Sequence, residues 1–192
     1  MKLKKLEQQI KRKKEVAIME TNGGLWLGTL QAMYAAYNLE PVTFDQLMVM
    51  FDVPEDKRES FSEIYSELLS RANTDDTDSS EIELQRVGIQ IVWHGKPLLP
   101  LSCENKEIYY IDQRTLDPVS DAADGITLYR RKDDTGRSYI AIKSGMLLLG
   151  LIEPEPIVDE MLLQYLKCLY DRSAATFQSI PLAEDPQERI YG

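Results

Sequence analysis

The chain has 192 residues, of which 32 are acidic and 22 are basic, and its formal net charge is −10. An acidic surface repels phosphates, so direct nucleic-acid binding is not expected. Hydrophobic residues make up 43% and charged residues 28%, as in an ordinary globular protein. Two cysteines are too few for a disulfide framework and no apolar run is long enough to cross a membrane, so we expect a cytoplasmic protein with free thiols.

The first 14 residues form a basic arm, with seven basic residues and one acidic residue, Glu7. The rest of the chain therefore carries a net charge near −16. Leu3, Leu6 and Ile10 recur at helical spacing, which predicts a short amphipathic helix. The basic face of this helix is expected to be solvated, or the arm docks on its own acidic body, on a neighbouring subunit or on an anionic partner, and the sequence leaves this choice open.

The first predicted strands form a hairpin. Residues 15–20 and 25–27 have β-forming composition and flank an Asn-Gly-Gly turn at 22–24, whose residues tolerate positive φ angles. The turn lacks the Lys and Ser/Thr of a phosphate-binding loop, so it predicts no nucleotide site. Residues 30–38 are expected to form a short helix or an irregular link.

Two helices are predicted next. The first spans 43–51 and begins with a capping box made by Thr43 and Gln46. The second spans 54–72 and has an apolar face at helical spacing. The pair also fits a helix-turn-helix, but acidic residues outnumber basic ones on the second helix and would repel a phosphate backbone. A structural helix pair is therefore the preferred interpretation.

The following segments combine a polar loop with β-structure. Residues 73–81 are acidic and are expected to form a mobile loop, since they lack the central glycine and closing glutamate of a calcium loop. Strands are predicted over 87–93, 97–101 and 107–111, the second as an edge strand because its prolines cannot donate to a β-ladder. Residues 112–125 are expected to be irregular.

The most regular β pattern spans residues 126–152. It predicts three strands joined by two tight turns, and the last strand, 146–152, is an apolar run suited to burial on both faces. Residues 157–170 predict an amphipathic helix, and 173–192 a flexible tail. Together these elements predict one α+β domain over 1–172, in which an antiparallel β-sheet, a meander of hairpins, is covered by amphipathic helices.

The irregular segment contains the only candidates for catalysis, which are Asp112, Asp117, Asp121 and Asp124. Two of these carboxylates could meet in space beside Arg114, as a site for acid–base chemistry requires. The alternative is that they are ordinary turn-forming aspartates in a solvated loop.

Further candidate binding residues are His94, Tyr109 and Tyr110, together with Arg114. His94 is the only histidine and lies in a His-Gly-Lys turn with no partner signposted nearby. The two tyrosines are neighbours on a predicted strand and should face opposite ways. Ten tyrosines against four phenylalanines favour a protein interface. The sequence contains no metal-ligand spacing and no cofactor motif, so we expect neither group.

Four stretches carry a resemblance to a known group: NGGLWLG, FDVPEDKRE, EIYYIDQRTLDPVSD and RSYIAIKSGMLLLGLIEP. The chain resembles small uncharacterised proteins carried by prophages and integrated mobile elements of gut Gram-positive bacteria, over most of residues 1–170. The resemblance implies a cytoplasmic accessory protein with an anti-defence or regulatory role, and it supplies no site residues.

Three functional hypotheses follow. The first is a non-enzymatic protein-interaction protein that binds a protein partner or forms a homo-oligomer, which fits the tyrosine content and the opposed charges of arm and body. The second is an acidic inhibitor that mimics nucleic acid and occupies a host defence or regulatory protein. The third is an enzyme that uses loop carboxylates within residues 112–124.

Overall fold

The computed structural model describes residues 1–122, 125–156, 164–165 and 167–172. Its strands are β1 Glu15–Thr21, β2 Gly24–Gly28, β3 Ala32–Ala35, β4 Ser62–Ile64, β5 Ile82–Arg86, β6 Ile91–Trp93, β7 Lys96–Ser102, β8 Ile108–Asp112, β9 Thr127–Lys132, β10 Ser138–Ser144 and β11 Leu147–Ile152. Its helices are α1 Leu3–Lys13, α2 Phe44–Met50, α3 Glu55–Arg58, α4 Glu67–Arg71 and the 3₁₀ helix η1 Gln113–Val119.

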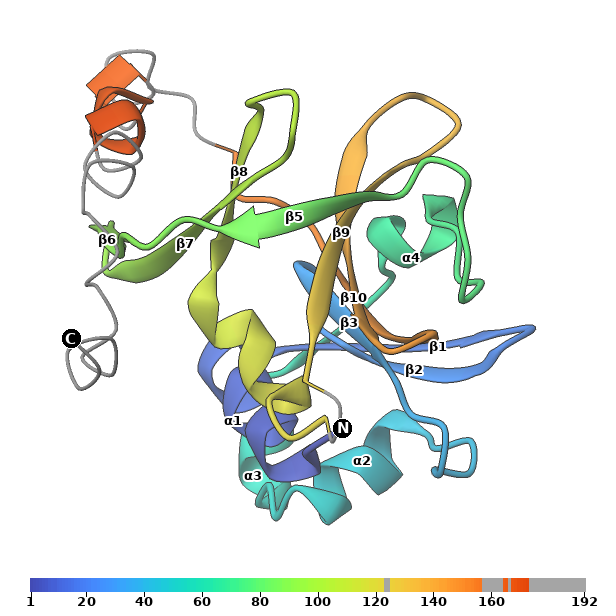
Figure 1. Cartoon of the computed structure of the whole chain (residues 1–192). Coiled ribbons are helices and arrows are strands. Elements are labelled where there is room, and N and C mark those ends of the chain that lie inside the picture. Colours follow the sequence, from blue (N-terminus) through green and yellow to red (C-terminus); the bar gives the residue numbers. More distant parts are fainter. Residues whose placement is uncertain (123–124, 157–163, 166, 173–192) are drawn as a thin grey trace, which may run out of the picture.

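The strands of the described residues form one sheet of order β4-β1-β2-β3-β11-β10-β9-β5-β7-β6, with β8 also paired to β7 (Figure 1). Neighbouring strands are antiparallel except for β1 and β4, which are parallel. The predicted α+β class, a mostly antiparallel sheet with helices packed on it, is therefore confirmed. No helix among the described residues is long and apolar enough to span a membrane.

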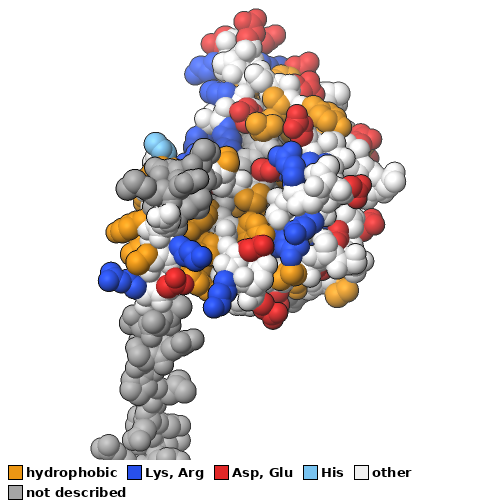
Figure 2. Space-filling model, turned by 90° about the horizontal axis from the view of Figure 1, so that it is seen from above, with side chains coloured by type: hydrophobic (Ala, Val, Ile, Leu, Met, Phe, Trp, Pro, Cys, Tyr) orange, Lys and Arg blue, Asp and Glu red, His pale blue; other side chains and the backbone are white. Residues whose placement is uncertain are grey.

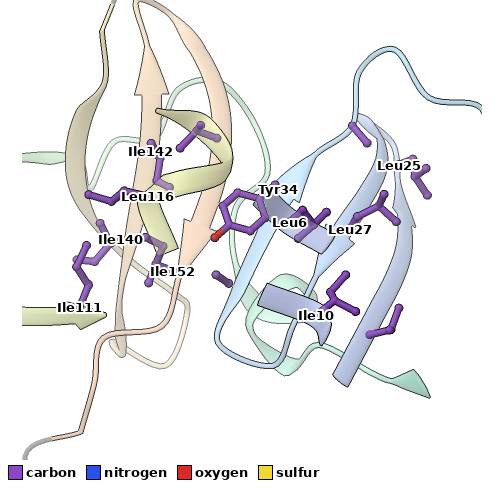
Figure 3. Packing of buried hydrophobic residues seen from close by; sticks show 14 of the residues in the cluster. Leu6, Ile10, Leu25, Leu27, Tyr34, Ile111, Leu116, Ile140, Ile142 and Ile152 are labelled. Carbon is purple, nitrogen blue, oxygen red and sulfur yellow. The ribbon is translucent and has the colours of Figure 1, made fainter. Parts of the chain in front are cut away.

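The predicted three-stranded unit of residues 126–152 is confirmed as β9, β10 and β11, and it lies in the middle of the sheet. Alternate residues of β10 face opposite sides, as strand geometry requires. Ile140 and Ile142 join the larger core, which also contains Leu6 and Tyr34 (Figure 3). Tyr139 on the other side joins a second cluster, which α4 covers through its leucines.

The sheet is curved, and a strand of its second half lies next to residues 153–155, which follow β11. The backbone N–H of Glu153 donates to Gln31 O at 2.8 Å, and that of Glu155 donates to Tyr110 O at 2.7 Å. The Glu155 carboxylate also accepts hydrogen bonds from Lys96 at 2.8 Å. Residues 153–155 therefore connect the residue before β3 to β8, and these two strands are far apart in the order of the sheet.

The basic arm docks on its own body as α1. Leu6, Gln9 and Ile10 are buried, while the lysines of the same helix are partly or fully exposed. The Lys2 backbone N–H donates to Pro118 O in η1 at 2.6 Å. Figure 1 shows α1 beside η1 at one end of the molecule, together with α2 and α3. The amphipathic face predicted from the leucine spacing is thus used within the chain.

Two predictions for the first half need different corrections. Residues 30–38 contain β3, a fully buried strand between β2 and β11, instead of a helix or an irregular link. The predicted helix over 54–72 is also wrong, because it divides into α3, β4 and α4. The intervening β4 pairs with β1, and pairing of this kind overrides a local helical pattern. The first helix and its Thr43 capping box are confirmed as α2.

The prediction of 97–101 as an edge strand is wrong. Strand β7 has β5 and β6 on one side and β8 on the other. Pro100 lies at the gap between β5 and β6, where its carbonyl still accepts from the Val87 N–H at 3.0 Å, so the missing proline N–H falls at the break between the two ladders. Of the strand predicted over 87–93, only residues 91–93 form a strand, β6, while β5 lies before the predicted range and was not predicted.

The remaining predictions concern the ends of the second half. The irregular segment 112–125 contains the helix η1. Residues 164–165 and 167–172 are helical, whereas the other residues of the helix predicted over 157–170 lie outside the described residues, as does the tail 173–192.

Candidate interaction surface and the predicted site residues

The Asp112 carboxylate is a structural group at the start of η1. It is 1% exposed and accepts hydrogen bonds from Arg114 Nε at 2.8 Å and Arg114 Nη2 at 2.7 Å, in a bidentate pair. It also accepts from the Arg114 backbone N–H and so caps η1. Burial opposes its ionisation, but the hydrogen bonds from Arg114 outweigh this effect and lower the pKa of Asp112. The side chains of Asp112 and Arg114 therefore already bind each other.

The other three aspartates of the predicted carboxylate site lie in different surroundings. Asp117 is exposed, Asp121 is exposed and forms an ion pair with Lys2, and Asp124 lies outside the described residues. Across the described ranges, no three histidine, cysteine or carboxylate side chains gather closely enough to hold a metal ion. The geometry gives the loop-carboxylate enzyme hypothesis no support beyond the sequence pattern.

The aromatic and histidine candidates have structural surroundings. His94 has a φ of 47° in the turn between β6 and β7. Its ring packs edge-on against the Trp93 ring, with 4.5 Å between the two ring centroids. Tyr110 is 5% exposed and packs in a small cluster with Leu98. Tyr109 faces the main core, and its hydroxyl donates to Glu107 Oε2 at 2.7 Å. Burial raises the pKa of Tyr109.

The acidic loop of residues 73–81 surrounds a buried cation that the sequence pattern did not identify. Arg131 on β9 is fully buried, and its Nε donates to Glu81 Oε1 at 2.9 Å. Its Nη1 donates to the backbone oxygens of Asn73 at 3.0 Å and Asp75 at 2.8 Å. Glu81 also accepts from Lys143 at 3.2 Å. The backbone N–H groups of Leu148 and Lys132 also donate to the loop, at Asp76 Oδ1 and Ser80 Oγ. The loop is thus anchored on the strands, with Arg131 at its centre, and does not form an independent linker.

A groove at α2 combines exposed apolar side chains with carboxylates. It has a volume of about 550 Å³ and is lined by Glu40, Pro41, Val42, Asp45, Gln46, Val49 and Met50. Leu47 and Met48 of the helix are buried in the core, while Val49 is 60% exposed and Met50 is 44% exposed. Helix α2 has apolar residues on most of its circumference. Such a pattern indicates that an apolar surface faces outward in addition to the one that faces the core.

The surroundings of this groove are acidic. Residues 40–67 contain eight acidic and two basic residues. All eight acidic side chains are exposed, and none forms a salt bridge with another described residue. On the face shown in Figure 2, by contrast, acidic and basic side chains are interspersed around apolar ones.

Comparison of the chain with family models, with curated proteins and with solved structures found no match.

Proposed function

We propose that the protein is a non-enzymatic protein-interaction module whose α2 groove binds an apolar segment of a partner protein that carries flanking basic residues. The observation that carries this proposal is the groove of about 550 Å³, whose lining includes the exposed Val49 and Met50 together with the carboxylates of Glu40 and Asp45. An accessory role in a mobile element stays a prediction from the resemblance.

The apolar part of the proposal rests on Val49 and Met50. Exposed apolar side chains that line a concave surface are a feature of interaction sites, because their removal from water stabilises a complex. Methionine adapts its unbranched side chain to differently shaped partners. Together with Pro41 and Val42 these residues form the apolar floor of the groove.

The electrostatic part rests on the unpaired carboxylates of residues 40–67. Because Glu40 and Asp45 lack a basic partner in the described chain, a partner's lysine or arginine can approach them without displacing an existing ion pair. Complementary charge at the edge of an interface speeds association and selects partners more than it strengthens binding. The expected partner segment is therefore apolar at its centre and basic at its flanks.

Selection from a random peptide-display library on the immobilised full chain tests this proposal. Enriched peptides should combine apolar residues with lysine or arginine, and fluorescence anisotropy should give their affinity. Val49→Lys places a charge in the groove and should weaken binding about tenfold or more. Val92→Lys is the matched control, because Val92 is 71% exposed on β6 and does not line the groove.

Enrichment of acidic or uncharged peptides, or equal binding by the two lysine variants, would refute the proposed occupant of the groove. A library that yields no binder above background would refute the interaction role of this surface.

A second candidate function, mimicry of nucleic acid, is favoured by the exposed carboxylates of residues 40–67. It requires that a basic partner lose affinity when Glu55, Asp56 and Glu59 are neutralised and that nucleic acid compete for the same partner. Val49→Lys should then have no effect, which separates this candidate from the groove proposal. The mixed charges in Figure 2 confine such a surface to other faces of the molecule.

A further inference from the structure

A second cavity, separate from the α2 groove, lies where the start of α1 meets the end of η1 and the turn between β10 and β11. Its volume is about 600 Å³, and it is lined by Met1, Lys2, Pro118, Val119, Asp121, Ala122, Ser144, Leu147 and Leu149. Small-molecule sites commonly measure about 300–1,000 Å³, so the cavity has the size of a ligand site.

The walls of this cavity are mostly apolar. Val119 belongs to the main core, Leu149 packs against that core, and Leu147 is 42% exposed at the opening. Met146, 71% exposed in the same turn, extends the apolar surface outward. Burial of a hydrocarbon body against these side chains is therefore favourable, since each buried methylene contributes about 0.8 kcal/mol.

The polar groups of the cavity are few and lie together. Lys2 forms an ion pair with Asp121, and the Lys2 and Asp121 side chains are 36% and 65% exposed. Lys2 Nζ also lies 3.4 Å from Ser120 Oγ. Exposed ion pairs contribute little to stability, about 0–1 kcal/mol, so the Lys2 ammonium can exchange its carboxylate partner at little cost.

Lys2 is the only cationic side chain among the residues that line the cavity, and Asp121 is the only carboxylate among them. The backbone of Lys2 is held in place, because its N–H donates to Pro118 O and its carbonyl accepts from the next turn of α1. The neighbouring carboxylates of η1 and its end are those of Asp117 and Asp121.

We infer that this cavity binds a small amphiphile that has an apolar body and a carboxylate head. The body lies against Val119, Leu147 and Leu149, and the head pairs with Lys2. A smaller cavity of about 130 Å³ shares Met1 as a wall, and it continues toward Leu3 and Leu39. A change in the flexible Met1 side chain would connect the two spaces, which suits an elongated hydrocarbon chain.

Isothermal titration calorimetry of the full chain with decanoate, kept below the micellar concentration of decanoate, tests the inference. Decan-1-ol and decyltrimethylammonium serve as neutral and cationic probes of the same length. Decanoate should bind with saturable 1:1 stoichiometry, the alcohol about tenfold more weakly, and the cation more weakly still. Equal binding of all three probes would overturn the proposed carboxylate head group.

Variants locate the binding on the structure. Lys2→Met should weaken decanoate binding about tenfold and leave decan-1-ol binding unchanged, whereas Lys4→Met on the same helix should change neither. Ala122→Trp fills the cavity and Leu147→Asp places a charge at its opening, and either should abolish binding of both probes. Both positions are at least partly exposed, so these chains should fold, and thermal unfolding checks this.

Decanoate binding that survives both Ala122→Trp and Leu147→Asp, or a wild-type chain that does not bind decanoate, would refute the inference. The selected peptides should bind the α2 groove of these variants normally. Loss of decanoate binding alone therefore separates this site from the proposed interaction function.

Discussion

Residues 40–67 and residues 73–81 are both acidic, yet the fold uses them in opposite ways. The carboxylates of 40–67 point into solvent without a basic partner, beside an apolar groove. In 73–81, Glu81 and several backbone carbonyls surround the buried Arg131. An acidic composition therefore does not reveal whether a segment is a structural contact or an available surface. The position of a cation on a distant strand decides this.

Removal of the Arg131 guanidinium should lower the free energy of unfolding more than any other change considered below. Arg131→Met leaves the carbonyls of Asn73 and Asp75 without their donor and removes one of the two partners of Glu81. Breaking a buried ion pair by deletion of one partner costs about 3–5 kcal/mol. Urea unfolding should show a loss of this size, and limited proteolysis should cut residues 73–81 faster.

Arg137→Met is the control for this change, since the Arg137 side chain is 61% exposed and its ion pair with Glu153 is long, at 3.5 Å. It should change the free energy of unfolding by no more than about 0.5 kcal/mol. If the two methionine variants were equally stable, the loop would not depend on Arg131 and the contrast between the two acidic segments would disappear.

A change at Asp133 should have an intermediate effect on stability. Its carboxylate pairs with Arg71 of α4, which lies in sequence between the two acidic segments. Burial opposes its ionisation, but hydrogen bonds from Thr135, Arg71 and the Arg137 backbone outweigh this and lower the pKa of Asp133 to about 2. Because the folded-state pKa is below the unfolded value, the stabilisation is complete above the unfolded pKa, near 4, and is lost as the pH falls toward 2.

Asp133→Asn should therefore destabilise the protein by about 1–3 kcal/mol at pH 7, because it loses charge-assisted hydrogen bonds. It should also flatten the loss of stability between about pH 4 and pH 2, measured by urea unfolding at each pH. Asp56→Asn is the matched change in the unpaired segment and should have neither effect. A variant pH profile that overlays the wild-type profile would contradict the role of Asp133.

The smallest effect on stability is expected from the unpaired carboxylates. The triple change Glu55→Gln, Asp56→Asn and Glu59→Gln should alter the free energy of unfolding by less than about 0.5 kcal/mol, since these side chains are exposed and unpaired. It should nevertheless slow association of a basic peptide with the α2 groove and reduce its dependence on salt, as stopped-flow fluorescence can measure. A large loss of stability would show that this surface is structural.

The parts of the fold that were predicted correctly are those with local signals. The hairpins of residues 126–152 have alternating or continuous apolar strands and turn residues between them, and Thr43 and Gln46 form their capping box within four residues of chain. The amphipathic helix of the arm, which buries Leu6 and Ile10, also follows from periodicity, whereas its docking on its own body was left open by the sequence.

Predictions failed where a distant segment decided the local structure. Residues 32–35 form a strand because β2 and β11 flank them, and β4 forms because it pairs with β1. The candidate site shows the same limit. Asp112 and Arg114 were identified from the sequence, but only the structure shows that each is occupied by the other. The cavity at Lys2 joins segments that are separate in the chain, whereas the groove at α2 is lined by residues 40–50 alone.

The α+β class, the central antiparallel strands, the capped helix at Thr43 and the acidic balance of the chain can all be inferred from the sequence, because they depend on composition and on contacts within a few residues. The three-dimensional fold is needed to tell which acidic segment is anchored and which is free, and where apolar side chains remain exposed. These features depend on pairings across the curled sheet, such as that of Arg131 with residues 73–81, and local propensity does not specify such pairings.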